Sequence, residues 1–83
     1  MKVGVYSLQK ILFQGEAESV NCKTAAGEIT ILGNHRPMLG MLVPGVMKIV
    51  DSEQKEHYME VEGGFLEVKP NNESRFIIDV PVS

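Results

Sequence analysis

The sequence predicts an all-β fold, a small β-sandwich or flattened barrel. In several segments apolar residues recur at every second position, the period of a strand with one buried and one solvated face. Turn-forming pairs such as Gly33-Asn34 and Pro44-Gly45 separate these segments at short intervals. No window keeps the three- and four-residue spacing of an amphipathic helix, because Gly or Pro interrupts most of the chain.

The alternation is clearest in four segments, near positions 47–49, 58–62, 66–69 and 75–80. In each of them, one set of alternate positions is expected to face the core. These positions are Met47, Ile49, Met59, Val61, Leu66, Val68, Phe76, Ile78 and Val80. Charged residues occupy most of the opposite positions, so each strand is predicted to have one buried face and one solvent-exposed face.

Small and amide-bearing residues predict how these strands are connected. Gly63-Gly64 indicates a bulge or tight bend between consecutive strands. Asn71-Asn72 can close a tight hairpin, because asparagine tolerates positive φ. Pro81 is expected to end the pairing of the last strand. With no repeat or linker, the 83 residues are predicted to form one domain, 1–83, since a chain of this size builds a single core.

Composition argues against several classes of partner. The formal net charge is −3 and the eight basic residues are scattered, so nucleic acid is not an expected partner. Cys22 is the only cysteine and is expected to act as a small buried apolar side chain. The uncharged run 38–47 is about half of the roughly 20 residues that a spanning helix requires, so it is not a membrane anchor.

No residue pattern predicts catalysis, a metal or a cofactor. His35 and His57 have no second ligand at a metal-site spacing. Glu60 and Glu62 share a strand face, but alternation places that face in solvent, where carboxylates lack the burial that tunes a general acid. Neither a glycine-rich phosphate loop nor a nucleophile elbow is present. We therefore expect a protein that is not an enzyme.

The run PMLGMLV at 37–43 follows His35 and Arg36 and does not alternate. It is either an inner strand buried on both faces or a surface loop whose apolar side chains contact a partner. We favour the partner interpretation, because short sandwich strands seldom bury both faces and methionine suits adaptable binding surfaces.

Four motifs in fixed order resemble the N-terminal domain of the F-type ATP synthase epsilon subunit, which is called delta in mitochondria. They are FQGEAESV at 13–20, GEITILGNHRPML at 27–39, PGVMKIV at 44–50 and EGGFLEVKPNN at 62–72. The resemblance implies a ten-stranded β-sandwich and a noncatalytic subunit of the central stalk, or rotor. This subunit links the gamma subunit to the c-subunit ring and couples ion translocation to ATP synthesis and hydrolysis.

The resemblance also implies contact residues. The gamma contact corresponds to His35, Arg36, Pro37, Met38 and Leu39, and the c-ring contact to Gly27 and Glu28. It implies a peripheral place at the cytoplasmic face of the inner or plasma membrane, or the organellar equivalent, with membrane association only through the complex. Three positions depart from the family pattern. Asn34 stands for a usual glycine, which is tolerated if φ is positive there, Arg36 stands for a small residue, and Thr30 stands for glycine.

Family members commonly continue into a C-terminal helical hairpin, and none is expected within these 83 residues. The chain is either a short rotor subunit or a domain of a longer one. The alternative function is a stand-alone β-sandwich adaptor that binds an unrelated protein through the same scaffold, because a fold does not determine a function.

Overall fold

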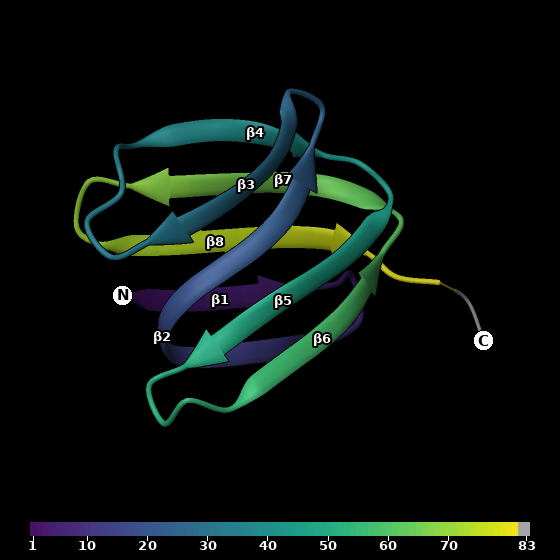
Figure 1. The fold of residues 1–83 in the computed structure, drawn as a ribbon. Coiled ribbons are helices and arrows are strands. Elements are labelled where there is room, and N and C mark those ends of the chain that lie inside the picture. Colours follow the sequence, from purple (N-terminus) through teal and green to yellow (C-terminus); the bar gives the residue numbers. More distant parts are fainter. Residues whose placement is uncertain (82–83) are drawn as a thin grey trace.

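A computed structural model describes residues 1–81, and these residues form β-strands and turns without a helix (Figure 1). The strands are β1 (Lys2–Tyr6), β2 (Ile11–Thr24), β3 (Gly27–Leu32), β4 (Met38–Leu42), β5 (Gly45–Asp51), β6 (Glu56–Val61), β7 (Gly63–Lys69) and β8 (Glu73–Asp79). The predicted all-β fold is confirmed. No helix in this part of the chain is long and apolar enough to cross a membrane.

The strands form two layers that share β2. The first layer has the order β1-β8-β7-β4, in which β1 and β8 are parallel and the other pairs antiparallel. The second layer holds β3, β5 and β6, with β3 on one side of β2 and β5 on the other. The strands of the second layer run across those of the first at an angle, so the space between them becomes the core (Figure 1).

Strand β2 accounts for part of the difference between the eight strands of the structure and the ten that the resemblance implied. Its first half pairs with β1, and its second half pairs with β3 and β5. A register irregularity between Ala17 and Ser19 marks the passage from one layer to the other. Because hydrogen bonding continues through this bend, one strand of 14 residues serves both layers.

The core contains most of the positions that alternation predicted. Met47, Ile49, Val61, Leu66, Val68, Phe76 and Ile78 are buried, and Met59 is half-buried against them. Val80 was predicted wrongly, because β8 already ends at Asp79, whose carbonyl accepts a hydrogen bond from the Glu62 N–H at 2.7 Å. Cys22 is buried as expected, and this burial raises the pKa of its thiol to about 11.

Two predicted connections are confirmed. Asn72 has φ 62° in the turn between β7 and β8, the left-handed conformation that asparagine tolerates. Gly64 has φ 140°, and a Cβ atom at this position would overlap the carbonyl oxygen of Ile77 on β8. Glycine is therefore required where β7 enters the first layer, both for its φ and for the close approach to β8.

Candidate interaction surface

The outer face of the first layer carries a continuous row of apolar side chains. The strand register places five residues side by side across five strands, and these are Met41, Phe65, Ile77, Tyr6 and Ile11. Four of them are exposed, with Phe65 at 61%. We call these five residues the apolar row.

Tyr6 is the half-buried member of the row because its ring lies flat on the sheet. The ring covers Gly4, where a Cβ atom would come within 2.8 Å of the Tyr6 Cε2 atom. Glycine at position 4 thus leaves a hollow that the aromatic ring fills. The result is a flat apolar surface rather than a set of separate projecting side chains.

Leu39 extends this surface at the outer strand of the layer. Its side chain is 80% exposed and belongs to the next row, in which it is followed by Glu67 and Arg75. The apolar row therefore has a polar border on this side. An apolar centre with a polar rim is typical of a protein–protein contact surface.

The outer face of the second layer is mixed, since the exposed side chains of Leu32 and Val46 lie among polar groups that bond to one another. The Asn21 side-chain amide donates to Thr30 Oγ1 at 2.9 Å. Lys48 Nζ lies 3.1 Å from a carboxylate oxygen of Glu56, and the Tyr58 hydroxyl donates to the same carboxylate at 2.9 Å. The hydrogen bond between Lys48 and Glu56 is the main cause that raises the pKa of Lys48 and lowers that of Glu56. These polar groups satisfy one another without a partner.

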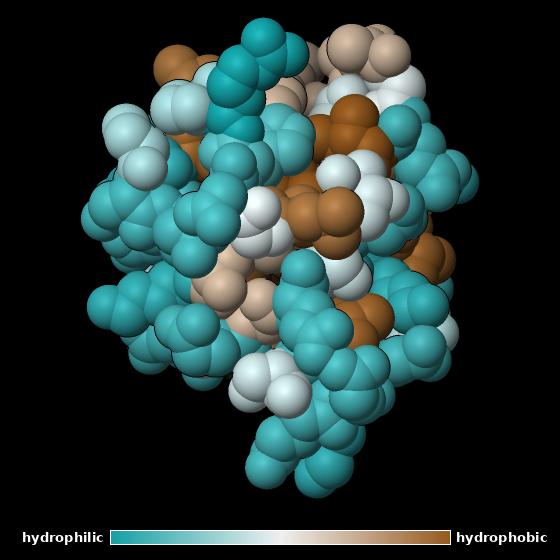
Figure 2. Space-filling model, turned by 60° about the vertical axis from the view of Figure 1, so that its left-hand side comes forward, coloured by the Kyte–Doolittle hydropathy of each residue, from teal (hydrophilic) through white to brown (hydrophobic). Residues whose placement is uncertain are grey.

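Apolar surface is therefore distributed unevenly over the molecule. Seen from the side at the left of Figure 1, hydrophilic side chains cover most of the surface, and hydrophobic ones gather in a band between them (Figure 2).

The run 37–43 matches neither interpretation of its sequence in full, because it forms a strand that is buried on one face only. It contains strand β4 and not a long loop, with Met38 half-buried and Leu42 buried on the core side. Leu39 and Met41 point outward and are exposed. The run lacks hydropathy alternation because the outer face of this strand is as apolar as its inner face.

The residues predicted to contact gamma do not lie on one face. His35, Arg36 and Pro37 belong to the loop between β3 and β4, where His35 Nδ1 lies 2.7 Å from the Arg36 carbonyl oxygen. Met38 packs against the core, and only Leu39 lies beside the apolar row.

Asn34 has a φ of 61°, the positive value that is needed for asparagine to replace the usual glycine here. The Asn34 N–H donates to the Asn72 side-chain oxygen at 2.7 Å, which ties the β3–β4 loop to the β7–β8 turn.

The residues predicted to contact the c ring lie elsewhere. Gly27 and Glu28 are exposed at the β2–β3 hairpin, at the start of β3, whereas His35 follows its end. The six residues of β3 separate the two sets by roughly 17 Å along the strand. The structure thus presents two separate candidate contact regions.

Most of the apolar row was not predicted from the sequence, namely Tyr6, Ile11, Phe65 and Ile77. One local signal was present, because Phe65 and Ile77 are apolar residues at solvent-facing positions of their strands: Ile77 lies between two buried residues, and Phe65 directly precedes the buried Leu66. Which outward residues become neighbours depends on strand register, which alternation within one strand does not reveal.

The remaining polar candidates have structural partners. His57 is half-buried, with Nε2 2.8 Å from Asp51 Oδ2 and its ring edge-on to Phe13 at 5.0 Å. Glu60 and Glu62 are exposed, as predicted. Among residues 1–81, no three His, Cys, Asp or Glu side chains are placed to hold a metal ion.

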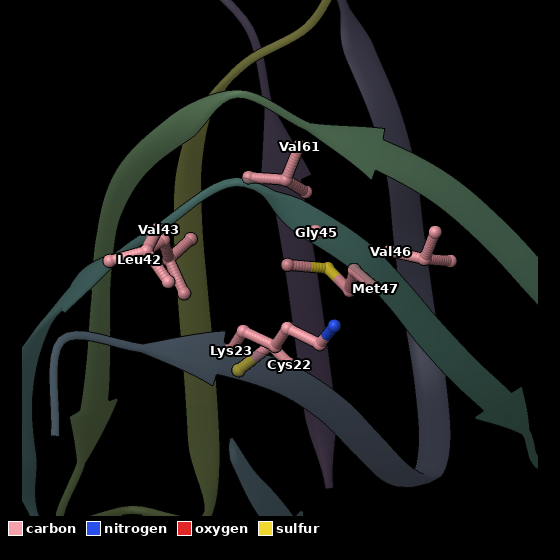
Figure 3. Close-up of a pocket in the computed structure, with 8 residues that line it drawn as sticks. All are labelled: Cys22, Lys23, Leu42, Val43, Gly45, Val46, Met47 and Val61. Atoms are coloured by element: carbon pink, nitrogen blue, oxygen red, sulfur yellow. The ribbon is translucent and has the colours of Figure 1, made fainter. Parts of the chain in front are cut away.

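The corner between β4 and β5 holds a narrow pocket beside Cys22, Leu42 and Met47 (Figure 3). It has no room for a water molecule, because these apolar side chains and the stem of Lys23 fill it. Gly45 fits beneath Lys23, where a Cβ atom would lie 2.7 Å from Lys23 Cδ. The pocket is a packed corner and not a ligand site.

Comparison with known proteins gives consistent matches. The family model described as "ATP synthase, Delta/Epsilon chain, beta-sandwich domain" matches residues 1–74. The ATP synthase epsilon chain of Bordetella parapertussis is 39% identical over 72 residues, covering 87% of this chain and 51% of that protein. The epsilon chain of Bordetella petrii is 40% identical over 70 residues, with 84% and 50% covered. The chain spans about half the length of these curated relatives.

Solved structures show the same fold at low sequence identity. A chain of the Euglena gracilis mitochondrial ATP synthase, from a structure of OSCP, F1 and c-ring, superimposes with a TM-score of 0.85 and 18% identity, covering 92% of this chain and 48% of that chain. A chain of the Tetrahymena thermophila mitochondrial ATP synthase, from its central stalk and c-ring, gives a TM-score of 0.80 and 19% identity, covering 94% and 62%.

Proposed function

The chain belongs to the ATP synthase delta/epsilon family, and from this premise we propose that it acts in the central stalk of an F-type ATP synthase. As a noncatalytic rotor component, it links the gamma subunit to the c ring and couples ion translocation to ATP synthesis and hydrolysis. The match of the beta-sandwich family over residues 1–74 carries this proposal. The two structurally similar chains come from assemblies of OSCP, F1 and c-ring and of central stalk and c-ring, which agrees with it.

The gamma subunit is the proposed partner of the apolar row together with residues 35–39. A rotor element must resist slipping, and a buried apolar anchor supplies affinity that solvated polar pairs do not. Leu39 connects the two regions, because it is exposed beside Met41 and follows the loop that holds His35 and Arg36.

The c ring is the proposed partner of Gly27 and Glu28. Both residues are exposed at the hairpin between β2 and β3, away from the 35–37 loop. An exposed carboxylate at a hairpin suits a polar contact that sets orientation rather than affinity. In this arrangement the protein lies at the cytoplasmic face of the inner or plasma membrane, or its organellar equivalent, and is held there by the complex.

Co-purification tests the gamma contact. The tagged chain, expressed with alpha, beta and gamma subunits, should retain gamma, and Leu39→Asp should weaken retention because it places a charge in an apolar contact. Leu32→Asp is the matched control, since Leu32 is 57% exposed on the second layer and should leave retention unchanged. A clean pull-down without gamma would instead favour the adaptor function.

Ion pumping tests the c-ring contact. Glu28→Lys reverses the charge of an exposed side chain, so it should change stability by less than about 1 kcal/mol. It should nevertheless lower ATP-driven pumping by membranes that carry the assembled complex. A large loss of Tm with intact pumping would mean that Glu28 is structural.

A further inference from the structure

The β2–β3 hairpin is shaped by one buried hydroxyl. Thr24 is 7% exposed and is one of two buried polar side chains among the described residues. Its Oγ1 donates to the Gly27 carbonyl at 2.7 Å and accepts from the Ala26 N–H at 3.2 Å. A single side chain therefore spans the turn and bonds to two of its backbone groups.

Two further hydrogen bonds fix the same hairpin to the first layer. The Ala25 N–H donates to the Met41 carbonyl at 2.9 Å, and the Val43 N–H donates to the Lys23 carbonyl at 3.1 Å. Thr24 lies directly opposite Leu42 in this short antiparallel pairing. The strand that receives the hairpin is thus the one that carries Met41 of the apolar row.

We propose that Thr24 is a positioning residue, which sets the shape of the hairpin that Gly27 and Glu28 present to the c ring. The hydrogen bond from the Ala25 N–H to the Met41 carbonyl then transmits force from this hairpin to β4, the strand that contributes Met41 to the proposed gamma contact. This inference rests on the proposed function. Thr24 acts through the backbone of Ala26 and Gly27 and does not contact the ring, because its own side chain is buried.

Thr24→Val tests the inference in the assembled complex, because valine keeps the shape of threonine and removes the hydroxyl. The substitution removes both hydrogen bonds of the hydroxyl, and loss of the one from the Ala26 N–H should speed amide hydrogen exchange at Ala26 about five-fold. Pumping per ATP hydrolysed should fall, while gamma retention stays at the wild-type level. Thr24→Ser keeps the hydroxyl and should restore both exchange and pumping, which a purely space-filling role of threonine would not allow.

Gly27→Ala is a second variant for the pumping test if the complex that contains Thr24→Val does not assemble. Gly27 has φ 123°, and a Cβ atom there would meet no other group within 4 Å, so alanine strains only the backbone of the turn. It should lower pumping in the same way.

The outcomes separate this inference from the proposed function. Normal pumping by Thr24→Val and Gly27→Ala, with Glu28→Lys impaired, would overturn the role of Thr24 alone. Unchanged exchange at Ala26 in Thr24→Val would also overturn it. Normal pumping by Glu28→Lys would overturn the c-ring contact, and with it this inference.

Discussion

The two outer faces of the sandwich differ in how their side chains are partnered. Phe65 on the first layer and Tyr58 on the second are almost equally exposed, at 61% and 60%. Phe65 lies between Met41 and Ile77, whereas the Tyr58 hydroxyl is held by Glu56. Exposure alone therefore does not identify a contact surface. Whether burying an exposed side chain in a contact is favourable depends on its neighbours on the adjacent strands.

This difference has a physical basis in desolvation. Covering the apolar row removes hydrocarbon from water, which is favourable at about 25 cal/mol per Å². Covering the second layer would remove the Lys48 and Glu56 charges from water, and this cost offsets much of the gain. The first layer is thus suited to binding, and the second layer to remaining in solvent or making weak contacts.

The largest effect is expected from placing a charge in the apolar row. Phe65→Asp should lower the affinity for isolated gamma by about 100-fold or more, because an unpaired carboxylate would be buried in the contact. The domain should remain folded, since the Phe65 side chain is exposed. Titration of gamma with each variant, monitored by calorimetry, measures the change.

Tyr58→Asp is the matched control for this substitution. It replaces an equally exposed aromatic residue on the other face, and affinity should stay within about two-fold of wild type. If Tyr58→Asp weakened gamma binding as much as Phe65→Asp, the difference between the faces would have no functional meaning. If only Tyr58→Asp weakened it, gamma would bind the second layer.

The next largest effect is expected on the stability of the first layer, at Gly64 beside Phe65. Gly64→Ala should lower the free energy of unfolding by about 2–3 kcal/mol, because φ is unfavourable for alanine and Cβ would overlap Ile77. Gly63→Ala is the control, since a Cβ atom at Gly63 lies 3.8 Å from the nearest group, the Leu42 carbonyl oxygen. Urea unfolding compares the two. Equal stability of both variants would show that β7 shifts away from β8 at little cost.

Much of the fold could be predicted from the sequence because strands with one charged face reveal their orientation locally. Met47 and Ile49 on either side of Lys48, or Leu66 and Val68 on either side of Glu67, fix which side is buried. The end of β8 was harder, since Val80 continues the alternation although pairing has stopped.

The candidate surface could be predicted only in part. The run 37–43 drew attention to β4, and Leu39 does lie at the surface as expected of a contact residue. Tyr6 and Ile77 are far apart in the sequence, and they become neighbours through the parallel pairing of β1 and β8. No pattern within either segment indicates that pairing, because it depends on the packing of the whole sandwich.

The smallest effect is expected from acid, and it should act through the second layer. Asp51 ends β5, where its Oδ1 accepts from the N–H groups of Glu53 and Lys55 at 2.8 and 2.9 Å. Its Oδ2 faces His57 Nε2. The hydrogen bond with His57, followed by that with Lys55, holds the pKa of Asp51 below its ordinary value of 3.8.

The sign of the effect follows from this lowered pKa. Near pH 3.8 the unfolded chain binds a proton at Asp51 more readily than the folded chain does, so stability increases with pH in this range. The contribution of Asp51 is complete above the unfolded pKa and is lost as the pH falls through the folded value. Asp51→Asn should therefore lower Tm at neutral pH and flatten the decline of Tm between about pH 5 and pH 2.

His57→Gln separates the two causes, because it removes the imidazole and leaves the Glu53 and Lys55 bonds to Asp51 in place. Its Tm profile should lie between those of wild type and Asp51→Asn, since the hydrogen bond with His57 is the largest cause of the shift. Thermal unfolding across the acid range measures all three proteins. Parallel profiles for wild type and Asp51→Asn would show that Asp51 does not link pH to folding.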